Sequence, residues 1–371
     1  MSATLGDVVA ALERLFPPSL AEPWDAVGLV LGDPAAEVRS VLFAVDPVEA
    51  LLPELDGHQL LVTHHPLWLG GTESMAATDP KGRFAHALVT RGCGLLVAHT
   101  NADRADPGVS DALAALFDLR GLTPLEAAPE AVDKLVFFVP TADADRVRDA
   151  VTAAGAGALG DYDCCTWSTP GTGTFRPLPG AQPVVGSLGE LASVDEVRVE
   201  TLVRRSARAQ VVQALREAHP YETPAYDVVP LADLPSGRGM GRVGDLPAPL
   251  RLGDLVALAA AVLPATAWGV RATGDPDQVV SRLAVMGGSG SDAMGLARMA
   301  GAQAFLTSDL KHHNASEGPE GLALIDAAHW ATEHPWLRAA ADALARVVEV
   351  ETTVSTTCTD PFTTAVRSPQ A

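Results

Sequence analysis

Two segments rich in histidine and carboxylate residues stand far apart in this chain of 371 residues. The first contains His64 and His65, and the second contains His329 and Glu333, so that the first and third of these histidines are 265 positions apart. Imidazole and carboxylate groups together form the ligand set of a borderline-to-hard divalent metal ion. If the fold brings the two segments together, the chain closes around one or two metal ions.

Composition excludes several other classes of protein. The formal net charge of -20 repels a phosphate backbone, so we expect no nucleic-acid partner. The longest apolar stretch, near 255–263, is too short to span a bilayer, and the first residues do not resemble a signal peptide. None of the four cysteines forms a CxxC pair, which is typical of a reduced protein. We therefore expect a cytoplasmic protein without a membrane partner.

Alternating apolar patterns indicate an α/β fold. Three apolar runs, Ser40–Val45, Gln59–Val62 and Leu95–Ala98, have the length of buried strands, and helical patterns intervene near 83–91 and follow near 109–118. Such alternation is typical of layered α/β proteins, which place their chemistry at the carboxyl ends of strands. The pattern resumes late in the chain, with strands at Ser281–Met286, Ala304–Thr307, Leu322–Ile325 and Glu349–Val354 and helices at Leu252–Leu263 and 334–347.

A different pattern interrupts the α/β alternation. Strand and helix patterns alternate at Leu135–Val139, 143–154, Glu196–Thr201, 207–218 and Tyr226–Val229, with a stretch rich in glycine, proline and threonine at 155–186. We interpret them as the strand-helix-strand repeat of a ferredoxin-like α+β unit. Ser236–Gly239 has the composition of a linker out of this unit. We therefore predict a metal-binding α/β domain formed by residues 1–130 and 236–371, with an α+β domain inserted at residues 131–235.

Each histidine motif has a structural alternative. His64 and His65 follow a strand, and because neighbouring residues of an extended chain face opposite ways, each could serve a different metal; the alternative is a hydrogen-bonded pair. Asp103, in the sequence HTNAD, would add an oxygen ligand, or it would belong to a turn. His329 and Glu333 share one face of a helix, where the glutamate could bridge two ions or form an exposed polar pair.

The motifs are stronger together than singly. Six of the ten histidines lie at or just after predicted strand ends: His64, His65, His99, His312, His313 and His329. Such ends tend to collect at one edge of a sheet, so we predict a metal site there.

Three further motifs leave two interpretations each. Within Thr307–His313, Asp309 could act as a base and Lys311 could contact a phosphate or oxyanion, or the segment is a capped turn with a surface lysine. Gly287–Gly290 lacks the ending of a phosphate loop, which favours close backbone packing beside the site. His219–Glu222 could bind a ligand, but a structural corner is favoured.

These motifs resemble, in order and nearly end to end, those of the GTP cyclohydrolase 1 type 2 homolog family, also described as NGG-interacting-factor-three-like proteins. The residues that carry the resemblance are Trp24–Leu29, His64–Pro66, His99–Asp103, Gly287–Gly290, Thr307–His313, Ala328–Glu333 and Thr359–Phe362. The inserted region is similar to that of the family's long form, with a CutA-like or PII-like domain.

The resemblance implies a dinuclear metal site and a ring-shaped homohexamer. The metal ligands that it implies are His64, His65, Asp103, His329 and Glu333. Four positions depart from the family pattern without removing a ligand, and the departures at Ala26 and Ser308 bear on substrate contacts; the four are Ala26, Ser110, Met286 and Ser308.

Two functional hypotheses follow. The first is a metal-dependent hydrolase of a nucleotide or phosphoester, similar to a GTP cyclohydrolase, with Glu333 as the bridging group. The second is a non-catalytic metal-handling or regulatory protein. Three imidazoles and two carboxylates suit Zn, Fe, Mn, Co or Ni equally, so the sequence does not choose the metal.

Overall fold

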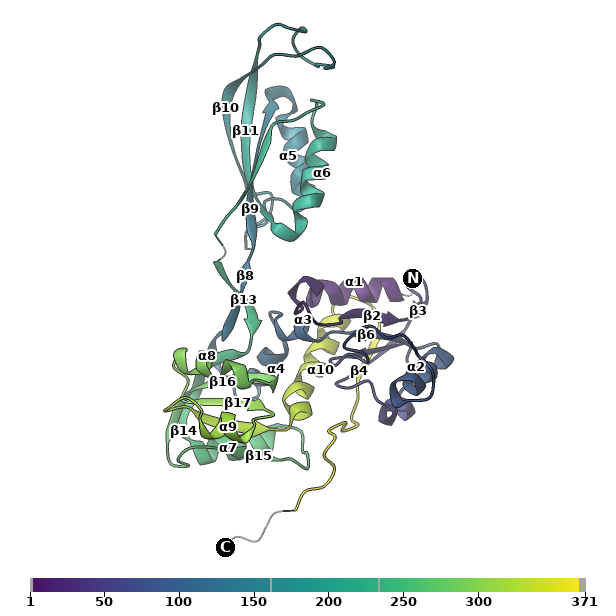
Figure 1. The fold of residues 1–371 in the computed structure, drawn as a ribbon, viewed down its shortest axis with the longest axis vertical. Coiled ribbons are helices and arrows are strands. Elements are labelled where there is room, and N and C mark those ends of the chain that lie inside the picture. Colours follow the sequence, from purple (N-terminus) through teal and green to yellow (C-terminus); the bar gives the residue numbers. More distant parts are fainter. Residues whose placement is uncertain (1–2, 161, 233, 367–371) are drawn as a thin grey trace. The chain divides into compact units, whose positions relative to one another are not determined.

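Two units make up the chain in the computed structural model, which describes residues 3–160, 162–232 and 234–366. The first unit contains the N-terminal residues as far as Ala128 and resumes at Gly237, and the second unit runs from Pro129 to Ser236. Together they form a mixed α/β fold (Figure 1). None of the described helices is both long and apolar enough to span a membrane.

The first sheet of the larger unit has the strand order β19-β4-β5-β6-β2. Strands β19, β4, β5 and β6 are parallel, and β2 runs antiparallel at the edge. The strands are β2 (Gly28–Leu31), β4 (Ser40–Ala44), β5 (Leu60–Thr63), β6 (Gly94–Val97) and β19 (Glu351–Val354). The inner strands are almost wholly apolar and buried, as expected for parallel strands that are covered on both faces.

The second sheet has the strand order β15-β18-β17-β16-β14-β7. Its three central strands, β16, β17 and β18, are parallel to one another. The strands are β7 (Arg120–Thr123), β14 (Arg242–Arg251), β15 (Val270–Ala272), β16 (Val279–Ser289), β17 (Ala304–Ser308) and β18 (Ala323–Ala327). The metal-site prediction assumed one sheet edge, whereas the structure has two separate sets of parallel strands.

Helix α10 (His329–Ala345) joins the two sheets of the larger unit, because it packs against β4 and β19 of one sheet and against β16 and β17 of the other (Figure 1). Its apolar side chains, including Trp336, Leu337 and Leu344, belong to one core with residues of both sheets. The other helices of this unit are α1 (Leu5–Leu15), α2 (Pro80–Arg91), α3 (Thr100–Asp103), α4 (Val109–Ala115), α7 (Leu252–Val262), α8 (Met294–Met299) and α9 (His312–Ser316).

The smaller unit has the element order β-α-β-β-α-β. Its antiparallel sheet has the strand order β10-β11-β9-β12, and helices α5 and α6 cover one face of it (Figure 1). The elements are β9 (Val132–Pro140), α5 (Ala144–Ala153), β10 (Thr166–Phe175), β11 (Ala192–Arg204), α6 (Arg208–Ala218) and β12 (Tyr226–Pro230). Strand β10 falls in a stretch rich in glycine, proline and threonine to which the sequence pattern assigns no strand.

Two short pairings complete the fold. Strands β1 (Ala3–Thr4) and β3 (Glu37–Val38) pair beside the start of α1. Strands β8 (Glu126–Glu130) and β13 (Leu234–Met240) form a two-stranded sheet where the chain passes between the units. The predicted linker Ser236–Gly239 contains the boundary between the two units, and its residues pair within β13. Gly239 allows this pairing, since a Cβ there would meet the Glu126 carbonyl oxygen at 2.0 Å.

Candidate metal centre

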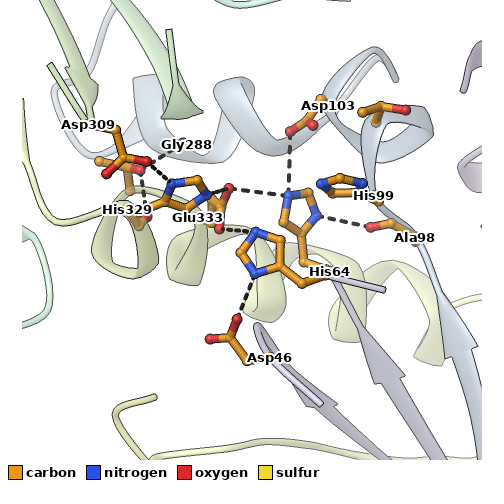
Figure 2. Close-up of polar contacts among 12 residues, drawn as sticks. Asp46, His64, Ala98, His99, Asp103, Gly288, Asp309, His329 and Glu333 are labelled. Carbon is orange, nitrogen blue, oxygen red and sulfur yellow. Dashed lines mark hydrogen bonds and ion pairs between the residues drawn. The ribbon is translucent and has the colours of Figure 1, made fainter. Parts of the chain in front are cut away.

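Residues at or just after the ends of six strands, three from each sheet, converge on one place in the larger unit (Figure 2). Three elements of the first sheet and three of the second contribute. The residues are Asp46 after β4, His64 and His65 after β5, His99 after β6, Gly288 at the end of β16, Asp309 after β17 and His329 after β18. Thus the strand-end argument holds, but two sheets that share α10 supply the residues.

The carboxylate of Glu333 lies at the centre of this cluster. Its Oε1 is 2.9 Å from Nε2 of His329 and 3.4 Å from Nε2 of His64. Its Oε2 is 3.2 Å from Nε2 of His65. His64 and His65 reach opposite oxygens of one carboxylate because β5 ends at Thr63, so that the two histidines stand in a bend rather than in an extended strand.

A hydrogen bond holds the far nitrogen of every histidine in the cluster. The Nδ1 acceptors are the Ala98 carbonyl for His64 at 3.0 Å, Asp46 for His65 at 2.7 Å, Asp25 for His99 at 2.8 Å and Asp309 for His329 at 2.6 Å. An acceptor at Nδ1 fixes the proton on that nitrogen when the ring is neutral and leaves the Nε2 lone pair free for a ligand bond. All four rings are therefore oriented as in metal-binding histidines.

Further contacts hold the carboxylates that orient these rings. The Thr100 amide donates to Asp25 at 3.0 Å, and the Thr100 hydroxyl donates to the same oxygen at 2.5 Å. The hydroxyl of Thr359, near the C-terminal end of the described chain, donates to Asp46. The orientation of His65 thus depends, through Asp46, on a residue that lies 313 positions after that aspartate.

Asp103 completes the acidic side of the cluster. It ends the short helix α3, and its Oδ1 lies 3.7 Å from Nε2 of His64. Burial raises the pKa of this carboxyl to about 6, although the imidazole of His64 acts in the opposite direction. The five residues implied as ligands by the motifs therefore lie together in the structure.

Some buried polar atoms of the cluster have no hydrogen-bond partner. Such atoms are free to bind a metal ion, so they indicate whether one fits here. In the part of the chain that the structure describes, Nε2 of His64 and Oε2 of Glu333 are buried and have no hydrogen-bond partner. Two overlapping groups have ligand atoms within 4.8 Å of one another: His64 with His65 and His99, and His65 with His329 and Glu333. Nitrogen and oxygen donors in this arrangement fit a divalent metal ion.

Gly288 leaves the space above the carboxylate open. A Cβ at this position would lie 2.6 Å from Oε1 of Glu333 and 3.1 Å from Nε2 of His329. The φ of Gly288 is 66°, a value that favours glycine, and its amide donates to the Thr332 hydroxyl at 2.9 Å. The glycine-rich motif therefore serves close backbone packing beside the cluster.

Without metal, the carboxylates of the cluster favour the protonated form of the imidazoles that face Glu333. Burial lowers the pKa of His65 and of His329, but the carboxylates around them raise these values to about 11 and about 10. Burial raises the pKa of Glu333, yet the three imidazoles hold it well below its usual range. His99 differs, because burial and the neighbouring His64 lower its pKa. In the metal-free cluster, protonated imidazoles therefore supply the positive charge that faces the Glu333 carboxylate.

Three residues of the sequence-based argument lie elsewhere. Lys311 is exposed at the start of α9, and none of the interactions among the described residues joins it to the cluster. His312 and His313 follow it on α9, and the side chain of His313 is 83% exposed. Their inclusion in the predicted cluster is wrong, because the chain turns away from the sheet after Asp309. The φ of Asp309 is 59°, and its carboxylate faces His329.

A pocket of about 280 Å³ adjoins the cluster. One side is polar and contains His65, His329 and Asp309. The other side is aromatic: the rings of Trp268 and Phe362 lie with their centroids 5.3 Å apart. A molecule in this pocket would touch both the imidazoles and the aromatic rings.

The sequence-based ligand set lacks three residues of the site. The strand-end pattern includes His99 in the predicted metal site, but the family motifs do not imply it as a ligand, and no sequence pattern assigns a role to Asp25 or Asp46. Only their position beside predicted strand ends or motifs could have marked them. The hydrogen bond between His99 and Asp25 joins residues 74 positions apart, so no local pattern contains it.

The fold and the cluster together define a mixed α/β protein with histidine and glutamate groups that can hold a metal ion. The chain belongs to the Duf34/NIF3 (NGG1p interacting factor 3) family, whose model matches residues 3–361. This confirms the resemblance inferred from the motifs.

Several relatives match over most of their length. A GTP cyclohydrolase 1 type 2 homolog from Mycobacterium leprae is 47% identical over 373 residues, covering 99% of this chain and 97% of that protein. The Bacillus subtilis protein of the same name is 34% identical over 330 residues, covering 87% of each. A crystal structure of a Bacillus cereus protein related to NIF3 is 32% identical, with a TM-score of 0.86, covering 98% of this chain and 100% of that one.

Proposed function

We propose that the chain binds two divalent metal ions and uses them to hydrolyse a nucleotide or another phosphoester. The observation that carries this proposal is the position of Glu333, whose two oxygens face the Nε2 atoms of three histidines. A carboxylate shared in this way is suited to bridge two ions. The two overlapping groups of ligand atoms, which have His65 in common, support the number two.

The proposed ligands are His64, His65, Asp103, His329 and Glu333, as the motifs imply. We add His99 as a proposed ligand, because burial and His64 lower its pKa, Asp25 orients its ring, and it belongs to one of the two groups. Such ions would supply Lewis-acid chemistry, which polarises a phosphoryl or carbonyl oxygen and acidifies water. The donors suit Zn, Fe, Mn, Co or Ni.

Asp309 has two proposed roles. It accepts a hydrogen bond from His329 and so fixes that ring, and this bond lowers the pKa of the aspartate despite partial burial. Because its carboxylate also lines the pocket, it can accept a proton from a bound molecule there. Lys311 stays a proposed phosphate contact; it is exposed on the segment that follows Asp309.

The aromatic wall of the pocket supports a substrate with a flat ring. The guanidinium of Arg271 lies 4.5 Å from the centroid of Trp268, on which it stacks, and is paired with Asp326 at 2.7 Å. These contacts hold Trp268 in place opposite the imidazoles. The bases of nucleotides are flat rings that stack on such surfaces, and the relatives' name, GTP cyclohydrolase 1 type 2 homolog, agrees with a nucleotide substrate.

Turnover separates this proposal from its alternative, a non-catalytic metal-handling or regulatory protein. The experiment measures metal content and then the hydrolysis of GTP and of p-nitrophenyl phosphate by the metal-loaded protein, by Glu333→Gln and by Glu317→Gln as a control. Hydrolysis that is lost in Glu333→Gln alone supports the enzyme. Two tightly bound ions without turnover on either substrate support the alternative, and a protein without bound metal contradicts both.

We further propose that the smaller unit is a ferredoxin-like insertion and that the protein is a homohexamer. The β-α-β-β-α-β element order supports the first statement, and the family resemblance supports the second. Light scattering on the purified full-length protein tests the assembly, because a hexamer has six times the mass of the 38.4 kDa chain. A monomeric mass would contradict the second statement.

A further inference from the structure

The smaller unit contains a cavity of about 600 Å³ that the proposed function does not use. It lies on the face of the sheet opposite α5 and α6, because Phe138 and Arg198 line it while the neighbouring Phe137 and Val199 lie in the core under those helices. Side chains alternate between the two faces along a strand. Residues 177 and 181–185, from the connection between β10 and β11, form the opposite wall. A volume of this size suits a metabolite-sized molecule.

Glycines make room for this cavity. Gly171 and Gly173 of β10 line it, and Gly171 lies opposite Glu196 of β11 in the sheet register. A Cβ at Gly173 would lie 2.1 Å from the Glu196 carboxylate, whereas a Cβ at Gly171 would meet no atom within 4 Å. Glycine weakens a strand interior, and its presence there often marks the close approach of a ligand.

The His219–Glu222 turn closes one end of the cavity. His219 is buried between the Phe138 carbonyl, at 2.9 Å, and the Tyr221 amide, which donates to it at 3.0 Å. Glu222 accepts a hydrogen bond from the Gln182 amide at 3.2 Å, which ties the turn to the β10–β11 connection. The motif is therefore a structural corner, as the sequence favours, and it also places Tyr221 and Glu222 in the cavity wall.

Acidic groups outnumber basic groups in this wall. Two carboxylates line the cavity, those of Glu196 and Glu222, and Arg198 is the one basic side chain among the described lining residues. The guanidinium of Arg198 is already paired with Glu200 at 2.9 Å. The Glu196 carboxylate accepts a hydrogen bond from the Tyr221 hydroxyl at 3.1 Å, and no arginine or lysine among the described residues forms an ion pair with it. The cavity therefore favours a positive ligand.

Aromatic rings surround the same carboxylate. Phe175 and Tyr221 lie edge to face with centroids 5.7 Å apart, and Phe138 lines the same wall. Faces of aromatic rings attract cations, and carboxylates bind ammonium groups directly. We propose that this cavity binds a metabolite-sized organic amine, with its ammonium group at Glu196 and its flat apolar body against Phe138 and Phe175.

Two probes of matched shape and opposite charge test the proposal on the full-length protein. Tryptamine carries an ammonium group, and indole-3-propionate carries a carboxylate on a side chain of similar length. Ligand-observed NMR titration measures both affinities. We expect tryptamine to bind at least about tenfold more tightly, because only its charge complements Glu196.

Three variants locate the binding. Glu196→Gln removes the charge but keeps an acceptor for Tyr221, and Gly171→Val fills the cavity from a position where a side chain has space and suits a strand. Each should weaken tryptamine binding at least about tenfold. Glu217→Gln, on the exposed face of α6, makes the same charge change elsewhere and should leave it unchanged.

Three outcomes would overturn the proposal: equal affinity for the two probes, unchanged tryptamine binding in both cavity variants, or no saturable binding of tryptamine. None of them bears on the metal cluster, because no residue of the cavity belongs to it. Conversely, loss of metal in Glu333→Gln with intact tryptamine binding would leave this proposal standing.

Discussion

Glu333 in the larger unit and Glu196 in the smaller unit both lie among ring side chains, but their surroundings are built in opposite ways. Three imidazoles face Glu333, and a hydrogen bond on the far nitrogen fixes each of them. One phenol contacts Glu196, and glycines of the adjacent strand leave the remaining space open. The first arrangement fixes ligand atoms in place, and the second leaves a volume for a molecule to fill. Rigid donors suit a metal ion, and open volume suits an organic ligand.

We expect the largest effect from a substitution of Glu333, at the centre of the histidine cluster. Glu333→Gln removes the charge that the imidazoles share, so we expect both metal ions and all hydrolysis to be lost. Elemental analysis of the purified protein measures the metal content. Glu317→Gln, an exposed acid beside His313 on α9, is the matched control and should keep full occupancy. A Glu333→Gln protein that retains two ions would show that this carboxylate is not a ligand.

Removal of one orienting carboxylate tests how much the fixed rings contribute. Asp25→Asn loosens His99 without touching the other rings, and we expect metal affinity to fall by about 10–100-fold. A competition titration with a chromogenic chelator measures the change. Asp56→Asn, where the side chain is 83% exposed, is the control. An unchanged affinity in Asp25→Asn would mean that His99 does not contribute.

Acidity should weaken metal binding steadily, because protons and metal compete for the same nitrogens. The pKa values of His65 and His329 rise to about 11 and about 10 without metal, from about 6.5 in an unfolded chain. In the metal-free protein their contribution to stability is complete below about pH 6.5 and is lost as the pH rises through the folded values.

Metal must displace these protons, so we expect affinity to rise by about tenfold per pH unit for each proton released. Competition titrations at several pH values from about 6 to about 8 measure the slope. A metal affinity that does not change with pH would contradict the prediction that metal displaces protons from these imidazoles.

We expect the smallest effect from alanine substitutions of the two glycines that line the cavity of the smaller unit. Gly173→Ala forces the Glu196 carboxylate to move, whereas Gly171→Ala points into free space. We expect the first variant to be less stable than the second by about 1 kcal/mol, since it weakens one hydrogen bond with Tyr221. Urea unfolding of the two proteins measures the difference. Equal stabilities would mean that Glu196 has room to adapt.

The parts of the fold that the sequence predicted are those with strong local patterns. Helix α10 begins at His329, so the spacing of His329 and Glu333 does place both on one helical face. The apolar runs before His64 and His99 are strands of a largely parallel sheet. These features depend on periodicity and on chain breaks that lie within a few residues of one another.

The parts that the sequence did not predict depend on distant contacts. Strand β10 contains Pro170, Gly171 and Gly173, which are rare in strands, and pairing with β11 overrides that local preference. The link between Asp46 and Thr359 joins residues 313 positions apart. Only the folded chain shows that the convergent residues come from two sheets and that His312 and His313 do not take part.

The two halves of the cluster have a consequence for how the protein matures. During synthesis His64 and His65 emerge first from the ribosome, the whole inserted unit follows, and Glu333 emerges only afterwards. Until α10 has emerged and packed against both sheets, the imidazoles of His64 and His65 lack their contact with the Glu333 carboxylate. If the cluster holds metal as proposed, loading is a late step in biogenesis, and a chain stalled within the insertion would hold only part of the site.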